Sequence, residues 1–235
     1  MPPAASTSGI AVPACGATAA VDRPWECVSL VHGFMANALM LSLLSQRLNR
    51  RGYLARSWGY TDMRRSILIH AEKFAHELST LDADRAVGTI HLVTHSMGGI
   101  IARAALDLYR PRKLGRFVML APPNRGSFVA TAAADLLGGL FQPVRELSTA
   151  EDSLVHALGM PDGIEVGVIA ASRDALVSSE STRPDVPHAH VTLPCLHSSL
   201  LFRRDAADLV AGFLARGEFP AVPSRVPGMR VGPTP

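Results

Sequence analysis

A serine between an apolar run and a pair of glycines is the clearest sign of chemistry in this sequence. Residues 90–101 read IHLVTHSMGGII, so Ser96 follows a strand-like run and precedes a helix-like one. A sharp strand-to-helix turn at a serine holds the hydroxyl above the end of the strand, where it can act as a nucleophile. Such a turn suits Gly98, whereas Thr94 requires small neighbours. The alternative is a serine that only caps the helix.

Two later segments can complete a nucleophilic site. The strand-like run 164–170 leads to Asp174, and the run 190–193 leads to His197. A serine nucleophile needs an imidazole that takes its proton and a carboxylate that holds the imidazole in the correct tautomer. We expect His197 to be the base and Asp174 to be its partner.

The choice of the carboxylate leaves alternatives. Glu180 and Asp185 lie on the same predicted loop as Asp174. Asp174 is preferred because it lies close to the carboxyl end of a strand, where a short side chain can reach an imidazole beside Ser96. Asp174 could also serve only its own turn, which is a common use of aspartate.

A second glycine turn follows a buried run near the start of the chain. Residues 28–34 read VSLVHGF. Acyl transfer forms an oxyanion that needs two preorganised N–H donors. The backbone amides of Phe34 and Met97 are the predicted pair. His32 is predicted to be structural and is given no role in proton transfer.

Apolar runs and helix-like patterns alternate along the chain. We expect strands at 26–31, 54–58, 89–94, 116–120, 164–170 and 190–193. We expect helices at 38–50, 64–81, 98–109 and 199–216, and a helical or irregular segment at 127–158. This alternation predicts an α/β fold with a doubly wound parallel sheet and helices on both faces. Ligands of such sheets bind at the carboxyl ends of the strands.

The chain is long enough for one α/β domain. It has 235 residues, of which 48% are hydrophobic, so wholesale disorder is excluded. Residues 1–23 are predicted to be a flexible N-terminal arm, 24–219 the folded domain, and 220–235 a proline-rich tail.

Three segments resemble the α/β-hydrolase family, in particular its small bacterial lipase/esterase-like branch. Residues 94–98 resemble the nucleophile elbow of that family, and residues 32–34 resemble its oxyanion loop. Residues 121–127, APPNRGS, are similar to a segment common in that branch. The resemblance covers about residues 25–217.

The resemblance implies the α/β-hydrolase fold. The family's chain order is nucleophile, acid, histidine. That order is met here by Ser96, Asp174 and His197. Thr94 departs from the family pattern, which has glycine there. The N-terminal region is too short for the family's first two strands, so we expect a minimal sheet of about six strands.

The site residues and the resemblance together predict a serine hydrolase. It would cleave carboxylic esters with short- to medium-chain acyl groups through an acyl-enzyme, acting on a small ester or a lipid-like substrate. Phe128, Leu137 and Phe141 are the predicted substrate contacts, although their segment could equally be a core-facing helix. The alternatives are an acyltransferase or amidase on the same triad and a non-catalytic binding module.

The charge pattern gives little support to a nucleic-acid partner. The formal net charge is +3, and the arginines are scattered. The tightest groups are Arg47, Arg50 and Arg51, and Arg64 and Arg65. Without a long basic run or interleaved aromatic residues, we interpret these arginines as solvated surface residues.

We expect neither a metal nor another cofactor. The histidine pairs at 91 and 95 and at 188 and 190 lack the carboxylate or cysteine cluster that would complete a metal site. His70, His76, Asp82 and Asp84 are interpreted as surface residues on a helix and at its end. Three cysteines, an odd number, do not indicate a disulfide framework, and Cys27 and Cys195 are expected to be buried.

The sequence predicts a cytoplasmic location. No window approaches 18 uninterrupted apolar residues, so no membrane-spanning segment is expected. The first 20 residues lack a basic n-region, which makes secretion or lipoprotein anchoring the less favoured alternatives.

Overall fold

The computed structural model describes residues 24–34, 36–61, 64–137, 142–151 and 153–220, without the side chains of 133–137. The predicted N-terminal arm, and all but the first residue of the predicted tail, lie outside this part of the chain. The predicted domain, 24–219, lies almost entirely within it.

Six strands form one sheet. They are β1 (Trp25–Val31), β2 (Leu54–Trp58), β3 (Val87–His95), β4 (Leu114–Leu120), β5 (Val166–Ala171) and β6 (Ala189–Leu193). Their order in the sheet is β2-β1-β3-β4-β5-β6, and every pair is parallel. The predicted α/β fold with about six parallel strands is confirmed.

The α-helices lie between the strands in the chain, except the last helix, which follows the last strand. They are α1 (Ser42–Asn49), α2 (Ile67–Ala83), α3 (Met97–Leu108), α4 (Phe128–Leu137), α5 (Gln142–Glu146), α6 (Leu154–Ala157) and α7 (Arg204–Arg216). Two short 3-10 helices, η1 (Ala38–Leu41) and η2 (His197–Leu201), precede α1 and α7. The segment 127–158, predicted to be helical or irregular, contains the three short helices α4, α5 and α6.

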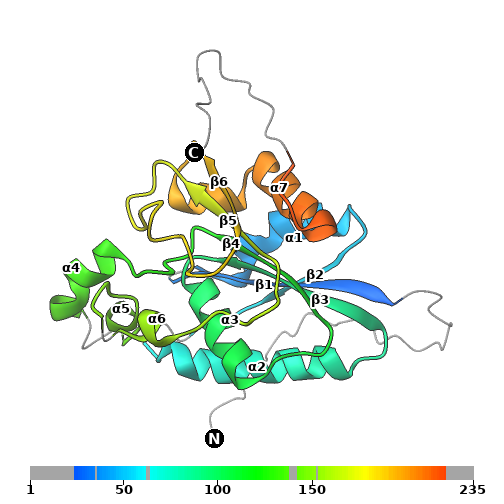
Figure 1. Ribbon diagram of the computed structural model, residues 1–235, viewed down its shortest axis with the longest axis horizontal. Helices are drawn as coiled ribbons and strands as arrows, with labels where there is room; N and C mark the ends of the chain where they lie inside the picture. The colour runs from blue at the N-terminus through cyan, green and yellow to red at the C-terminus, as the bar shows by residue number, and fades with distance from the viewer. Residues whose placement is uncertain (1–23, 35, 62–63, 138–141, 152, 221–235) are drawn as a thin grey trace, which may run out of the picture.

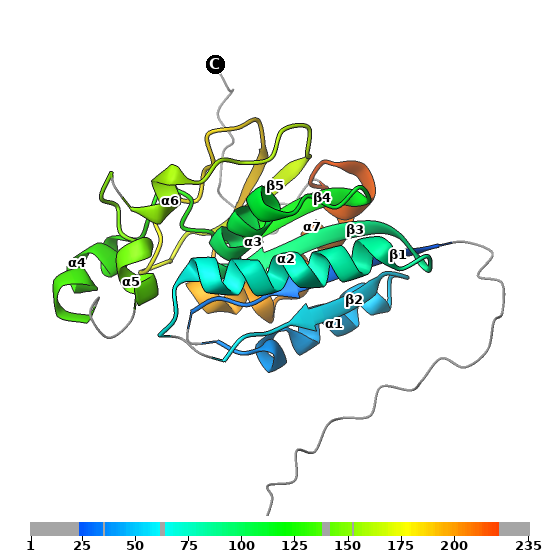
Figure 2. The same cartoon turned by 90° about the horizontal axis from the view of Figure 1, so that it is seen from below.

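The helices cover both faces of the sheet. Helices α2 and α3 pack side by side on one face, and α1 and α7 lie on the other (Figures 1 and 2). Alternate residues of a strand enter the two cores: in β4, Phe117 faces α2 and α3, and Val118 faces α1 and α7. Burial on both faces explains why the central strands are nearly continuous apolar runs.

The two strand ends that matter for chemistry are aligned by the sheet register. Val31 of β1 pairs with Thr94 of β3, and His95 of β3 pairs with Leu120 of β4. Because all strands are parallel, their carboxyl ends lie at one edge of the sheet. Residues that follow β1, β3, β5 and β6 are therefore brought to the same edge.

The start of α2 is held by a residue far away in the chain. Ser66 caps the helix, and its hydroxyl accepts a hydrogen bond from the Leu68 amide (3.1 Å). Glu146 of α5 accepts hydrogen bonds from the Ser66 hydroxyl (2.6 Å) and the Ile67 amide (2.7 Å). A carboxylate there also complements the helix dipole. Glu146 thus anchors the α4–α6 segment to the sheet domain.

Two of the residues interpreted as surface residues are buried. His70 is only 1% exposed and packs its ring 4.4 Å from that of Tyr60. Asp82 is 2% exposed and accepts hydrogen bonds from the Tyr109 hydroxyl (2.9 Å) and the Lys113 amide (3.1 Å). Both interpretations were wrong because the partners come from other elements. His76 and Asp84 are exposed, as predicted.

Cys27 and Cys195 are buried free thiols, which confirms their prediction, and Cys15 lies outside the described residues. Within the described ranges, no helix has the length and apolar character needed to cross a bilayer. The cytoplasmic location stays a prediction.

Candidate active site

Ser96 occupies a sharp turn between β3 and α3. Its backbone has φ 52° and ψ −129°, in the half of the map that non-glycine residues rarely adopt. The Ser96 amide donates to the Leu120 carbonyl of β4 (2.9 Å), and its own carbonyl accepts from the Gly99 amide (2.9 Å). These bonds hold the strained conformation. The serine side chain is thereby placed at the carboxyl edge of the sheet.

The glycines around Ser96 are required by close backbone approaches. A Cβ at Gly98 would lie 2.6 Å from the carbonyl oxygens of Val31 and His32. A Cβ at Gly33 would lie 2.8 Å from the Cβ of Ser96. The loop after β1 and the serine turn therefore touch, and neither accepts a side chain at the contact.

Thr94, where the family pattern has glycine, fits because it faces another glycine. A Cβ at Gly99 would be only 3.3 Å from Thr94 Oγ1. The threonine hydroxyl is buried and has no hydrogen-bond partner among the described residues. The Thr94 side chain therefore fits at this position because Gly99, which it faces, has no side chain.

His197 and Asp174 form a buried pair. Asp174 Oδ2 accepts a hydrogen bond from His197 Nδ1 at 2.6 Å, and the two side chains are 2% and 9% exposed. The other oxygen, Oδ1, accepts from the amides of Leu176 (2.8 Å) and Val177 (2.9 Å). Asp174 therefore serves its own turn and the imidazole at once.

The charge of Asp174 is stabilised by these bonds. Burial by itself raises the pKa of the carboxyl, but the hydrogen bonds from His197, Val177 and Leu176 outweigh it and lower the pKa below its usual value. With a carboxylate at Nδ1, the imidazole carries its proton there. Its Nε2 is then left with a lone pair that can accept a proton.

The two alternative carboxylates face another partner. Arg125 forms ion pairs with Glu180 (2.9 Å) and Asp185 (2.6 Å). Their side chains are 73% and 82% exposed. Neither environment matches the buried contact that Asp174 makes with His197.

His95, the neighbour of Ser96, packs against His197. Their ring centroids are 4.8 Å apart, and His95 Nε2 lies 3.4 Å from the His197 carbonyl oxygen. Burial, together with the nearby His197, lowers the pKa of His95 to about 3. This neutral ring links the serine turn to the loop that carries His197.

His32 holds the loop that follows β1. The Tyr60 amide donates to its Nε2 (3.3 Å), so Nδ1 carries the proton and donates to the Gly33 carbonyl (2.9 Å). Tyr60 also stacks on the imidazole at 4.2 Å and donates its hydroxyl to the His32 carbonyl (3.0 Å). Burial lowers the pKa of His32, which keeps the ring neutral.

The His32 contact bears on the orientation of the Phe34 amide. The Gly33 carbonyl and the Phe34 N–H belong to one peptide unit, and no peptide bond in the described chain is cis. In a trans peptide these two groups point in opposite directions. A carbonyl held against His32 therefore turns the Phe34 N–H away from His32.

Tyr60 and His95 belong to this site, although the sequence analysis assigned neither of them a role in it. His95, the last residue of β3, lies within the segment 94–98 but was considered only as a metal ligand. Tyr60 lies just after β2, and its position at the carboxyl end of a strand was the only signal available. That signal is shared by many residues without a function.

Solved structures with similar folds include lipases and esterases, at low sequence identity. Lipase BlEst2 of Bacillus licheniformis in its mature form aligns with a TM-score of 0.59 and 17% identity, over 77% of this chain and 89% of that one. Lipase B of Aspergillus fumigatus aligns with a TM-score of 0.65 and 15% identity, over 86% of this chain and 55% of that one. The esterase Pf2001 of Pyrococcus furiosus aligns with a TM-score of 0.59 and 15% identity, over 82% of this chain and 83% of that one.

The chain has the α/β-hydrolase fold. No protein-family model matches it. Among curated proteins, a Mycoplasma pneumoniae protein provisionally named esterase/lipase 3 is 28% identical over 103 residues, or 41% of this chain. The match spans 36% of the length of that protein. The chain is similar to these proteins, and it shares the α/β-hydrolase fold with the solved structures.

Of the three predicted substrate contacts in this α/β-hydrolase fold, the structure describes only the Phe128 side chain. Phe128 begins α4 and is 81% exposed. The Leu137 side chain and the whole of Phe141 lie outside the described residues. All three stay predictions.

Several exposed apolar side chains lie on segments that follow the carboxyl ends of strands. We call them the apolar rim: Leu39, Phe128, Val129, Leu176 and Leu196. Leu176 follows Asp174, and Leu196 precedes His197. The Ser127 hydroxyl donates to the Leu176 carbonyl (2.8 Å), which ties the start of α4 to the Asp174 loop.

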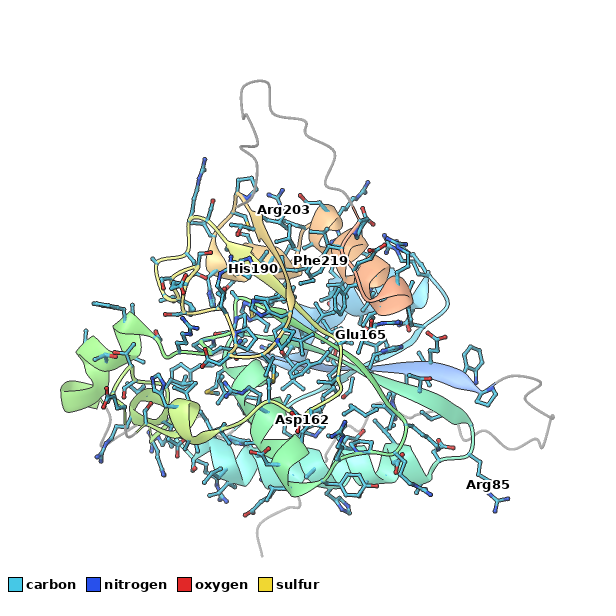
Figure 3. The ribbon with its side chains drawn as sticks, in the orientation of Figure 1. Arg85, Asp162, Glu165, His190, Arg203 and Phe219 are labelled. Carbon is cyan, nitrogen blue, oxygen red and sulfur yellow. The ribbon has the colours of Figure 1, made fainter. Side chains whose placement is uncertain are left out.

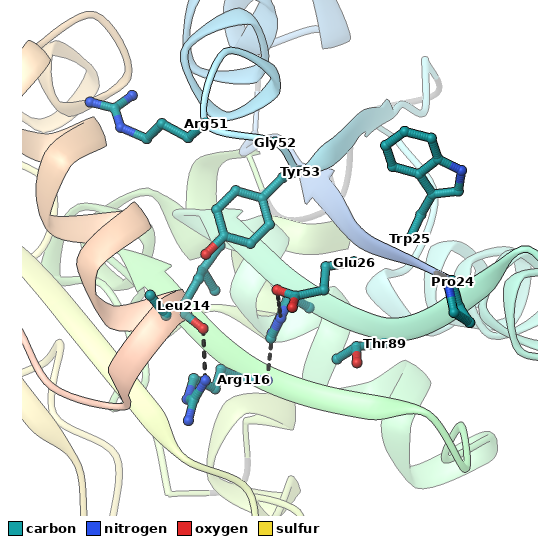
Figure 4. Close-up of a pocket in the computed structure, with 11 residues that line it drawn as sticks. Pro24, Trp25, Glu26, Arg51, Gly52, Tyr53, Thr89, Arg116 and Leu214 are labelled. Carbon is teal, nitrogen blue, oxygen red and sulfur yellow. Dashed lines mark hydrogen bonds and ion pairs between the residues drawn. The ribbon is translucent and has the colours of Figure 1, made fainter. Parts of the chain in front are cut away.

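A separate cavity of about 620 Å³ lies at the opposite edge of the sheet (Figure 4). It is lined by residues that precede strands, such as Pro24 and Tyr53, and by Leu214 near the end of α7. Its buried His91 accepts a hydrogen bond from the Arg116 amide at Nδ1 (2.9 Å). None of Ser96, Asp174 and His197 lines this cavity. Among the described residues, no group of three or more potential metal ligands occurs.

Proposed function

We propose that this protein is a serine hydrolase that cleaves carboxylic esters through an acyl-enzyme. The observation that carries the proposal is the buried Asp174–His197 pair, at 2.6 Å, whose imidazole packs against His95, the residue before the strained turn at Ser96. A positive φ at a serine costs free energy, of order 1–3 kcal/mol, and such strain clusters at active sites.

In the first step the ester acylates the serine. His197 Nε2 takes the proton from Ser96 Oγ while the oxygen attacks the ester carbonyl carbon. The carbonyl π electrons move to oxygen and form a tetrahedral oxyanion. When the intermediate collapses, the bond to the alkoxy group breaks, and His197 returns its proton to the leaving alcohol.

The second step releases the acid. Water takes the place of the alcohol, gives a proton to His197 and attacks the acyl carbon. Collapse of this intermediate breaks the bond to Ser96 Oγ, which recovers the proton. In both steps Asp174 holds the imidazole and stabilises its positive charge.

We assign the hydrogen bonds that stabilise the oxyanion to the backbone amides of Phe34 and Met97. Phe34 lies on the loop that touches Ser96 through Gly33, and Met97 follows Ser96 in the chain. His32 is a positioning residue in this scheme, because it fixes the Gly33 carbonyl and with it the direction of the Phe34 amide. It takes no part in proton transfer.

The apolar rim supports short- to medium-chain acyl groups as substrates. Its exposed side chains can cover a few methylene groups, each worth about 0.8 kcal/mol on burial. The cap available in the described chain is limited to the short helices α4, α5 and α6. A deep tunnel for long chains would need more protein than this.

Labelling with a fluorophosphonate tests the nucleophile directly. We expect a covalent adduct on Ser96, mapped by mass spectrometry of the digested protein, and no adduct in Ser96→Ala. Absence of labelling in the folded protein would favour the non-catalytic binding module.

A series of p-nitrophenyl esters tests the reaction and the chain length. We expect the highest kcat/KM with short to medium acyl chains. Product analysis with an added alcohol separates hydrolysis from transfer: a dominant transfer product would make the protein an acyltransferase. A steady rise of kcat/KM to C16 esters would contradict the proposed chain length.

A further inference from the structure

A hollow lined mainly by arginines lies between α1 and α7. Its volume is about 370 Å³, and we call it the arginine hollow. The lining residues are Leu43, Arg47, Arg50, Arg51, Arg204 and Asp208. Helices α1 and α7 are neighbours on one face of the sheet (Figure 1). None of Ser96, Asp174 and His197 lines the hollow.

The charge of the hollow is strongly unbalanced. Four arginines and a single aspartate leave it a formal net charge of +3, equal to that of the whole chain. Like charges held close together repel each other and raise the free energy of the folded state. An anion bound among them would remove this repulsion.

Two of the arginines are held in place by the protein. Arg47 Nη1 donates to the carbonyls of Phe202 (2.8 Å) and Arg203 (2.7 Å), just before α7 begins. Arg51 Nη1 donates to the Arg47 carbonyl (2.8 Å), and Nη2 forms an ion pair with Asp208. These contacts fix the positions of two guanidinium groups before any ligand arrives.

The other two arginines have no such partners. Arg50 and Arg204 are exposed, and within the described part of the chain neither side chain makes a hydrogen bond or an ion pair. They come from the end of α1 and the start of α7, so they reach the hollow from both helices. Their donors are free to bind a ligand.

We propose that the arginine hollow binds a phosphate group, carried by a soluble molecule or by a lipid headgroup. A guanidinium presents parallel N–H donors that match two phosphate oxygens, and several arginines can share one phosphate. A phosphate monoester carries close to two negative charges, which suits a net charge of +3 better than a single carboxylate does.

Space for the remainder of the ligand is present. Arg51 also lines the 620 Å³ cavity of Figure 4 and a third hollow of about 400 Å³ that contains Asp208. A molecule bound by its phosphate among the arginines can therefore extend along α7 without meeting the core. This site does not depend on the proposed ester hydrolysis.

Binding of inorganic pyrophosphate, followed by isothermal titration calorimetry at an ionic strength of about 0.1 M, where the Debye length is about 10 Å, tests the proposal. We expect saturable binding of one pyrophosphate to the intact chain. Arg50→Gln combined with Arg204→Gln should weaken it by at least about tenfold, because both removed side chains donate to the anion. The lysine pair, Arg50→Lys with Arg204→Lys, should retain part of the affinity because it keeps the charges.

A matched control separates a local site from general electrostatics. Arg56→Gln combined with Arg85→Gln removes the same amount of charge from exposed residues outside the hollow. Figure 3 shows Arg85 at the far end of the molecule from Arg203. The control pair should bind pyrophosphate within about twofold of the parent, because long-range charge effects are weak when screened.

Vesicles identify the source of the phosphate. We compare vesicles that contain phosphatidic acid, whose headgroup is a phosphate monoester, with phosphatidylcholine vesicles in a sedimentation assay, using the same variants. Binding to the anionic vesicles that the hollow variant loses and the control retains supports the proposal and assigns the phosphate to a lipid. The proposal is overturned if neither probe binds, or if both double variants lose affinity equally. Ester turnover by the hollow variant should equal that of the parent.

Discussion

The charged side chain of Asp174 at the carboxyl edge of the sheet is buried and paired, whereas two of those in the arginine hollow are exposed and unpaired in the described chain. At the carboxyl edge, the Asp174 side chain is 2% exposed, and its charge is matched by His197 and two backbone amides. In the arginine hollow, Arg50 and Arg204 are exposed and have no partner in the described chain. Buried charges must be paired inside the protein, whereas exposed charges are solvated and can bind a partner from solution.

This difference predicts how each region responds to substitution. A buried, paired group supports chemistry through its position, so its removal should strongly affect activity. An exposed, unpaired group contributes little to folding, so its removal should affect only ligand binding.

Ser96→Ala should give the largest effect. Ester turnover should fall by about 10³-fold or more, because the nucleophile is lost while the oxyanion amides and substrate binding remain. The thermal unfolding midpoint should not decrease, since alanine is no more strained than serine in this turn. Turnover within tenfold of the parent would exclude Ser96 as the nucleophile.

Asp174→Asn should give the next largest effect. The amide oxygen can still accept from the Leu176 and Val177 amides, but the charge that stabilises the imidazolium is lost. We expect kcat to fall by about 10²–10⁴-fold with little loss of stability.

The two alternative carboxylates provide the matched controls for Asp174→Asn. Glu180→Gln and Asp185→Asn change exposed partners of Arg125 and should keep activity within about tenfold of the parent. A large loss in Glu180→Gln together with a small loss in Asp174→Asn would reassign the acid.

His32→Ala should reduce kcat by about 10–100-fold with KM nearly unchanged, because a misdirected Phe34 amide matters mainly in the transition state. The effect is smaller than loss of the nucleophile, since the Ala36 amide also donates to the Gly33 carbonyl (3.3 Å). His32→Asn can place a donor near the position of Nδ1 and should recover part of kcat. A loss of stability with kcat unchanged would show that His32 is only structural.

His95→Gln should make stability less dependent on pH. The folded protein lowers the pKa of His95 to about 3, whereas an unfolded histidine titrates near about 6.5. Between these values the unfolded chain binds a proton that the folded protein excludes. The free energy of unfolding should therefore fall as the pH falls, by at most about 1.4 kcal/mol per pH unit for this residue.

Urea unfolding at several pH values between 8 and about 4 measures this slope, which we expect to be shallower in His95→Gln. His76→Gln, an exposed residue of α2, is the control and should keep the parent slope. Equal slopes in the parent and His95→Gln would contradict the burial argument.

Arg50→Gln should give the smallest effect. Without ligand, it removes repulsion in the arginine hollow and should leave the free energy of unfolding unchanged or raise it by up to about 0.5 kcal/mol. Arg51→Gln instead breaks the partly exposed ion pair with Asp208, and it should lower the free energy of unfolding by less than about 1 kcal/mol. Thermal unfolding at low and high salt measures both. A large destabilisation by Arg50→Gln would mean that Arg50 has a structural partner.

The sequence alone predicted the strands, the sheet class and the residues of the candidate site. Buried parallel strands are short apolar runs, and each run here is followed closely by glycine, proline or polar residues that end it. Ser96, Asp174 and His197 each follow such a run closely. Because parallel strands bring their carboxyl ends together, residues far apart in the chain could be assigned to one site.

Only the tertiary structure decided which side chains are partners. It distinguished Asp174 from Glu180 and Asp185 by placing Arg125 beside the latter two, and it gave Asp82 partners from beyond α3. It also brought Arg204 of α7 to the arginines of α1, so that residues scattered in the sequence became one hollow. Local patterns report the burial and the conformation of a segment, because these depend on neighbours a few residues away. Contacts between side chains depend on how separate elements pack, which no local pattern encodes.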